Sequence, residues 1–269
     1  MSIRALLLAL ACCILPAAAP PPAAPPSVPS TPQLRPGEDL ALAGPDGQVH
    51  QYGDAARETP MGGMAKFVWL SLEGTDWGSM DLRFRCTGSW EGHACWKPKG
   101  HGKVDLDQAV QSSCTLAFLA WGRMSAALWK HDYGDGPGRV RMEQAFEPFL
   151  GRRMPPGDGI PEITPAWVGD GDLLRASPVS MVRWLQDPAQ DAAVRLIRRC
   201  LTSFSKYVFE TGSWWVSADP APGTEGPAAG PAWAAGSDGE YLAVLRVPAG
   251  LGPAAAEARF RELMHIPKD

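Results

Sequence analysis

The stretch FRCTGSWEGHACWKPKGHGKVDLDQAVQSSCTLAF, residues 84–118, joins two segments of different composition. Its first part belongs to a loop rich in glycine, cysteine and tryptophan, which we expect from Thr75 to Gly102. From Asp105 to Leu128 the sequence predicts a helix that is broken or bent around Ser112 and Ser113. A turn-rich loop that leads into a bent helix is therefore expected in the middle of the fold.

Extended segments are predicted towards both ends of the chain. Leu40–Leu42 and Val49–Tyr52 flank the turn cluster Gly44–Gly47, and this pattern indicates a β-hairpin. At the other end we expect strands over Tyr207–Ala218, Ala232–Ala235 and Tyr241–Val247. The chain ends should therefore contribute strands to one sheet.

Helices are predicted between these strands. An apolar stretch from Met64 to Leu72 is long enough for a buried helix, and residues 151–172 have the composition of a loop. Ser177-Pro178 is a capping residue followed by proline at the first helical position, which marks the start of another helix. Further helices are expected over Ala192–Phe204 and Ala254–Met264. The fold class is α+β, with an antiparallel sheet from both chain ends packed on helices.

The N-terminal segment has the composition of a secretory signal peptide, which we place at residues 1–19. Arg4 precedes the apolar run Ala5–Leu15, and small residues follow at Ala17–Ala19. Cys12 and Cys13 keep a lipid anchor open as the alternative, although Leu10 fits a lipidation motif poorly. We therefore expect an exported protein of the periplasm or cell envelope, with a membrane tether through this segment as one possibility.

The remaining organisation follows from composition. Proline dominates residues 20–37, which predicts an extended linker and leaves residues 38–269 as one folded domain. Of the 269 residues, 45% are hydrophobic, enough for a substantial core. The formal net charge of −4 argues against a nucleic-acid partner, which requires a basic surface.

Four segments in order resemble the serine penicillin-recognising superfamily, which includes penicillin-binding transpeptidases and class D β-lactamases. Residues 84–118 are similar to the stretch that leads into the second motif of class B penicillin-binding proteins, and GDGDLLRASPVSMVRWL (169–185) to a later helix. FETGSWWVSADP (209–220) and AWAAGSDGEYLAVLRV (232–247) resemble the strand of the third motif and its neighbour. The resemblance covers about residues 38–266 and implies a β-lactamase/transpeptidase-like fold.

The first motif of that superfamily, Pro-x-Gly-Ser-x-x-Lys, aligns with Pro60–Lys66. Its serine attacks an acyl carbonyl, and its lysine, one helical turn later, accepts the proton. Gly63 occupies the position of the serine, whereas Lys66 is retained. Because glycine has no side chain, Gly63 cannot form an acyl-enzyme, so the resemblance implies a domain that has lost its nucleophile.

The other two motifs also depart from the superfamily pattern. Ser113-Cys114-Thr115 stands where Ser-x-Asn is usual, so Ser113 is retained and Thr115 replaces asparagine. Glu210-Thr211-Gly212 stands where Lys-Thr-Gly binds the carboxylate of the substrate. Glu210 would repel that carboxylate instead. Trp214, two residues further on, is a candidate for lining a ligand groove.

Structural interpretations compete with these functional ones. Lys66 is more easily explained as a partly buried cation than as a base, and it could pair with Glu210 across the cleft. Ser113 could be a helix-end hydroxyl, and Trp214 or Trp215 could be buried. Asp132–Gly136 lacks the ligands of a calcium loop and suggests a plain turn.

Cysteine and histidine usage leaves further alternatives open. A disulfide between Cys86 and Cys95 is plausible in an exported protein, but counting cysteines does not fix connectivity. We do not expect Cys114 to replace the nucleophile, because the middle residue of the second motif points into the body of the domain in that superfamily. Cys200 is expected in the core, on a helix with Leu196 and Phe204. The five histidines show no metal-ligand spacing, and His101, in Gly100-His101-Gly102, suggests a turn. We therefore assign no metal and no cofactor.

Three functions remain in competition. The favoured hypothesis is a non-catalytic envelope protein with a transpeptidase-like domain that binds peptidoglycan peptide, glycan or another envelope protein. A structural module with a closed cleft is a related possibility. The alternative is an active transpeptidase, carboxypeptidase or β-lactamase-type enzyme with a displaced nucleophile.

Overall fold

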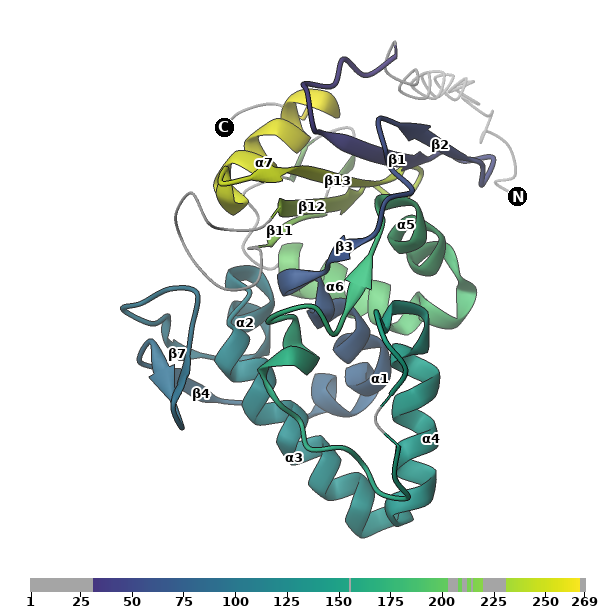
Figure 1. Cartoon of the computed structure of the whole chain (residues 1–269). Coiled ribbons are helices and arrows are strands. Elements are labelled where there is room, and N and C mark those ends of the chain that lie inside the picture. The colour runs from purple at the N-terminus through teal and green to yellow at the C-terminus, as the bar shows by residue number, and fades with distance from the viewer. Residues whose placement is uncertain are drawn as a thin grey trace, which may run out of the picture.

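The centre of the fold is a five-stranded antiparallel sheet with strand order β11-β12-β13-β1-β2 (Figure 1). The computed structural model describes residues 31–154, 156–202, 208–209, 212–213, 215–219 and 231–266. The sheet contains β1 (Asp39–Ala43), β2 (Val49–Tyr52), β11 (Trp215–Asp219), β12 (Pro231–Ser237) and β13 (Leu242–Ala249). β1 pairs with β13 in a register that sets Leu40 opposite Leu245. The predicted sheet from both chain ends is therefore confirmed.

Alternating side chains on the sheet enter two different cores. Leu40 and Leu245 project to one face, where they pack with Phe260 of α7 (Gly252–Leu263). Trp233 projects to the opposite face and joins the larger core formed with the other helices. Successive residues of a strand point to opposite faces of the sheet, and here both sets are apolar. Helices cover both faces (Figure 1).

The larger core is built around α1, which carries two fully buried tryptophans. Trp69 and Trp77 stack with ring centroids 6.1 Å apart, and the Trp69 indole donates a hydrogen bond to the Trp167 carbonyl at 2.8 Å. Gly122 lies against this indole, where a Cβ would come within 2.9 Å of the ring. The helices on this side are α1 (Ala65–Ser79), α2 (Leu106–Ser112), α3 (Thr115–Tyr133), α4 (Asp135–Phe146), α5 (Pro178–Gln186) and α6 (Asp191–Thr202).

Short elements complete the described chain. The 3-10 turn η1 (Gly62–Met64) leads directly into α1. The remaining two-stranded pairs are β3 (Thr59–Pro60) with β8 (Arg175–Ala176), β4 (Phe84–Cys86) with β7 (Gly102–Val104), β5 (Ser89–Trp90) with β6 (His93–Ala94), and β9 (Val208–Phe209) with β10 (Gly212–Ser213). The other 3-10 turns are η2 (Glu147–Phe149), η3 (Pro165–Val168) and η4 (Pro188–Gln190). Within the part of the chain described, no helix is both long enough and apolar enough to cross a membrane.

Most predicted helices are present, with shifted boundaries. The bend at Ser112 and Ser113 is the junction of α2 and α3, and Ser177 caps α5 with a reciprocal hydrogen bond to Ser180. Helix α1 continues past the expected loop start at Thr75, because Trp77 adds to the buried face.

Two sequence interpretations differ from the structure. Asp132–Gly136 is not a plain turn throughout, because Gly134, with φ of 80°, ends α3 and α4 starts at Asp135. The single strand expected over Tyr207–Ala218 is interrupted: β9 and β10 pair with each other, and the sheet strand β11 starts only at Trp215.

A buried ion pair ties the sheet to the segment before η1. The guanidinium of Arg246 on β13 donates from both Nε and Nη2 to Asp39 Oδ2 on β1, the Nε distance being 3.0 Å. Arg246 also donates to the Arg57 carbonyl at 2.8 Å. The side chains of Arg246 and Asp39 are 1% and 3% exposed. If one of them were removed, water could not solvate the charge of the other.

We predict that Asp39→Ala lowers the free energy of unfolding by about 3–5 kcal/mol, because it leaves the Arg246 charge buried and unpaired. Chemical denaturation followed by tryptophan fluorescence measures the loss. Asp81→Ala serves as the control, because the Asp81–Arg83 pair is largely exposed and should change stability by less than about 1 kcal/mol. Equal effects of the two substitutions would contradict this assignment.

Candidate functional site

Gly63 lies where the superfamily pattern places its nucleophile, in the turn that starts α1. From Met61 to Leu70, Gly63 is the one residue that is not fully buried. The turn is fixed from outside: the Met61 amide donates to the Leu174 carbonyl at 2.9 Å, and the Trp233 indole donates to the Pro60 carbonyl at 3.1 Å. The edge strand β11 lies against this turn. Position 63 is therefore a partly open site between α1 and the sheet edge.

Lys66 lies on α1, one turn after Gly63, and is only 3% exposed. Its Nζ donates to Ser113 Oγ at 2.8 Å and to the Val110 carbonyl at 3.1 Å. From the superfamily resemblance we expect the Lys66 amine to lie within reach of Ser113 or Glu210, and the contact with Ser113 is confirmed. A buried ammonium requires such oxygen acceptors, because burial without them would be costly.

Ser113 adopts a left-handed backbone conformation, with φ of 47° and ψ of 49°, at the C-terminus of α2. The Trp96 indole donates to the Ser113 carbonyl at 2.9 Å and to the Ser112 carbonyl at 3.1 Å. Thr115, half-buried, begins α3 directly after this turn. A left-handed non-glycine residue costs about 1–2 kcal/mol, so the surrounding contacts hold Ser113 in place against that strain.

The third motif falls mostly outside the described residues. Glu210, Thr211 and Trp214 are not among them, so the expected Lys66–Glu210 pair stays a prediction. Gly212 lies in β10 and pairs with Phe209, not with the five-stranded sheet. The strand that lies beside the Gly63 turn is β11.

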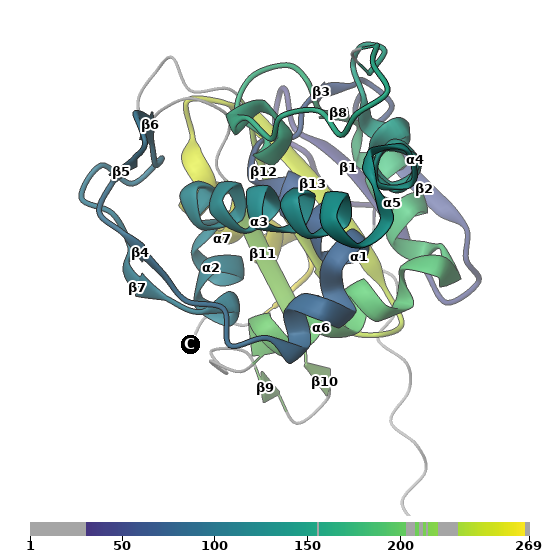
Figure 2. The same cartoon turned by 90° about the horizontal axis from the view of Figure 1, so that it is seen from below.

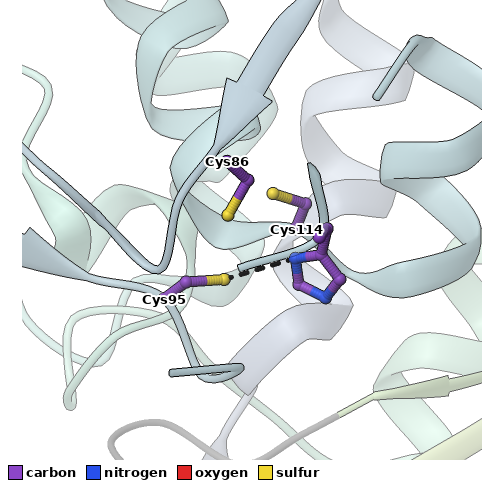
Figure 3. Close-up of side chains that lie close together, drawn as sticks. Cys86, Cys95 and Cys114 are labelled. Atoms are coloured by element: carbon purple, nitrogen blue, oxygen red, sulfur yellow. Dashed lines mark hydrogen bonds between the residues drawn. The ribbon is translucent and has the colours of Figure 1, made fainter. Parts of the chain in front are cut away.

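A second group of chemically reactive side chains was missed by the sequence analysis. Cys86, Cys95, His101 and Cys114, here called the cysteine–histidine cluster, place one ligand atom each within 4.8 Å of one another (Figure 3). The three cysteines are buried and none forms a disulfide, so the disulfide considered between Cys86 and Cys95 is not formed. Cys95 Sγ lies 3.5 Å from His101 Nδ1.

Two close backbone approaches assemble the cluster. Gly100 has φ of +71°, and a Cβ there would lie 2.2 Å from the Cys86 carbonyl oxygen. Gly88 has φ of +91°, and a Cβ there would lie 1.9 Å from the Pro98 carbonyl oxygen. Only glycine fits at such positions. The glycines of the sequence stretch 84–118 thus let two loops cross and bring the cysteines together.

The electrostatics of the cluster favour a shared negative charge. A hydrogen bond from the Cys114 thiol lowers the pKa of Cys95, and His101 lowers it further, although burial opposes the shift. The same bond and burial raise the pKa of Cys114. A sequence search for three cysteines and one histidine in a single turn-rich segment would have found the cluster, whereas the search for paired histidines did not.

Comparisons with known proteins identify the fold. The class D β-lactamase OXA-427 has 16% identity over 84% of this chain and 94% of its own, with a TM-score of 0.56. The penicillin-binding protein PonA1 from Mycobacterium tuberculosis has 10% identity over 84% of this chain and 75% of its own, with the same TM-score of 0.56. A class D β-lactamase from Fusobacterium nucleatum subsp. polymorphum has 10% identity over 86% of this chain and 93% of its own, with a TM-score of 0.54. No protein-family model and no curated protein matches the sequence.

These similarities establish the fold that the motifs implied. The chain has the fold shared by penicillin-binding proteins and class D β-lactamases. At this level of identity the comparisons carry no information on activity. What the described site contains is a lysine–serine hydrogen bond beside a position without a side chain.

We predict that Ser113→Ala lowers the free energy of unfolding by about 1–3 kcal/mol, because it removes an acceptor of the buried Lys66 ammonium. Thermal unfolding by circular dichroism tests this. The neighbouring Ser112→Ala is the matched control, since the Ser112 hydroxyl donates only to the Gln108 carbonyl within its own helix and its loss should have little effect. A stability of Ser113→Ala equal to that of Ser112→Ala would show that the Lys66–Ser113 bond is unimportant.

Proposed function

We propose that this chain is an exported cell-envelope protein whose transpeptidase-like domain binds peptidoglycan peptide or an envelope protein and does not catalyse acyl transfer. The observation that carries the proposal is Gly63 at the start of α1, with Lys66 and Ser113 retained beside it. Covalent catalysis in this superfamily depends on the missing hydroxyl, and loss of a nucleophile costs many orders of magnitude in rate.

A binding role is supported by what remains around Gly63. The turn is partly open to solvent, while the lysine and serine behind it are buried and bonded to each other. Such an arrangement preserves the wall of a cleft without a reactive group in it. The signal-like residues 1–19 and the proline-rich residues 20–37 would place the domain outside the cytoplasm, at a distance from the membrane.

We expect the purified chain to form no covalent adduct with a β-lactam. Intact-mass spectrometry after incubation with a penicillin tests this directly. The alternative, an acyl-transfer enzyme with a displaced nucleophile, requires a one-to-one adduct on the wild-type protein. That result would contradict the proposal, and peptide mapping would identify the acylated residue.

Substitutions test whether the motifs account for the missing reactivity. Gly63 lies in a 3-10 turn and is not among the glycines with positive φ, so serine can adopt its backbone. We predict that Gly63→Ser alone gives little adduct, because Glu210 would repel the carboxylate of the penicillin. Gly63→Ser combined with Glu210→Lys should give more. Equal adduct in the single and double variants would show that Glu210 does not face the cleft.

Binding is tested by co-sedimentation with purified peptidoglycan. The wild-type chain should be retained, and Gly63→Phe should reduce retention at least tenfold by filling the cleft. Gly136→Phe is the control, since Gly136 is exposed on α4 with open space around it. Circular dichroism verifies that both variants fold. Failure of the wild type to sediment, or equal retention of both variants, would contradict binding of peptidoglycan at this cleft.

A further inference from the structure

We propose that the cysteine–histidine cluster binds one zinc ion, and that this ion holds the Ser113 turn in place against Lys66. Neither part depends on the proposed function of the cleft. The site would be structural, because its three cysteines are buried, His101 is half-buried, and four ligands complete a tetrahedral shell.

The geometry of the cluster fits a zinc ion. Tetrahedral zinc with bonds of about 2.0–2.3 Å places its ligand atoms roughly 3.3–3.8 Å apart. The sulfur and nitrogen atoms of the cluster all lie within 4.8 Å of one another, so movements of a few tenths of an ångström by each side chain would close the shell. Figure 3 shows the three sulfur atoms and the imidazole ring directed towards a common centre.

The donor types select the metal. Three thiolates and one imidazole form a soft ligand set that suits zinc, whereas calcium and magnesium require oxygen ligands. His101 Nδ1 is the ring nitrogen directed at Cys95, while its Nε2 is buried with no hydrogen-bond partner. The orientation of the ring is therefore explained by the cluster and not by a hydrogen bond on its far side.

A disulfide is the competing explanation for neighbouring cysteines in an exported protein. It would join two of the three cysteines and leave the third thiol and the imidazole buried without a role. A single metal ion accounts for all four side chains at once. The difference is measurable, because a disulfide leaves the denatured chain two hydrogen atoms lighter, whereas a zinc-bound chain regains its thiol protons when acid denaturation releases the ion.

The four ligands come from separate parts of the chain. Cys86 ends β4, Cys95 follows β6 and His101 precedes β7, whereas Cys114 lies between α2 and α3. Figure 2 shows the strands β4 to β7 at one side of the molecule, beside α2 and α3. A metal ion bound here would cross-link these strands to the junction of α2 and α3.

The same ion would fix the turn that contacts Lys66. Cys114 follows Ser113 directly, and Trp96, which donates to the Ser113 carbonyl, follows Cys95. One ligand, Cys114, is therefore adjacent to Ser113 itself, and another, Cys95, is adjacent to the tryptophan that bonds to the Ser113 carbonyl. The ion would supply part of the restraint that keeps the Ser113 hydroxyl 2.8 Å from Lys66 Nζ.

Metal content tests the first part of the proposal. The full chain is purified with reductant and without chelator, supplied with Zn²⁺, freed of excess metal and measured by inductively coupled plasma mass spectrometry. We expect one zinc per chain in the wild type and less than a tenth of that in Cys86→Ser and Cys114→Ser. Cys200→Ala is the matched control: Cys200 is buried on α6 outside the cluster, so this variant should keep one zinc.

A spectroscopic measurement covers the case in which the serine variants fail to fold. Wild-type protein stripped of metal is titrated with Co²⁺, and we expect thiolate-to-cobalt charge-transfer bands with the visible absorption of tetrahedral cobalt, saturating at one equivalent. Absence of these bands, together with no zinc in the reduced wild type, would overturn the proposal. An intact mass lower by two hydrogens, with no metal after reduction, would instead establish the disulfide.

Hydrogen–deuterium exchange tests the second part. The Cys114 amide donates to the Ala109 carbonyl at 3.0 Å. We expect removal of zinc by a chelator to raise exchange of peptides that contain residues 112–115 at least tenfold, with no change in β13. Unchanged exchange at 112–115 after complete zinc loss would refute the role of the ion in holding the turn.

Discussion

The ammonium of Lys66 is almost completely buried. The packing around the candidate site depends on the protein oxygens that accept its hydrogen bonds. Its hydrogen bonds to Ser113 Oγ and the Val110 carbonyl link α1 to the end of α2. A buried charge without such acceptors would be strongly destabilising. The position of the α2–α3 junction is therefore constrained by α1.

The edge of the sheet lies beside the turn that precedes this lysine–serine pair. Strands from both chain ends pair through β1 and β13, and β11 forms the edge that lies against the Gly63 turn. The buried Asp39–Arg246 pair fastens this sheet to the segment that precedes the turn. None of these described interactions uses a side chain at position 63, so they hold the fold together with glycine there.

The loop before α2 connects the cleft to the cysteine–histidine cluster. Trp96 bonds to the Ser113 turn, and Cys114 belongs to both the turn and the cluster. The two features are thus neighbours in space as well as in sequence. The Ser113 turn therefore serves as an attachment point for this loop.

The sequence by itself determined the order of strands and helices, and it showed glycine at position 63 with Lys66 and Ser113 at two other positions of the superfamily motifs. These properties are local or periodic: alternating apolar residues define strands, the Ser177-Pro178 pair defines a helix start, and motif spacing fixes which residues face each other along one helix. The contact between Lys66 and Ser113 was predicted from the superfamily resemblance and not from local pattern, because the two residues belong to motifs that are far apart in the sequence.

Only the tertiary structure decided which cysteines come together and where the sheet edge begins. Cys86, Cys95, His101 and Cys114 have no regular spacing, and they meet because Gly88 and Gly100 allow two loops to cross at distances no other residue permits. In the same way, β11 starts at Trp215 because pairing with β12 selects its register, whereas local propensity favoured one longer strand. Contacts between residues distant in sequence are set by packing, and packing cannot be read from local pattern.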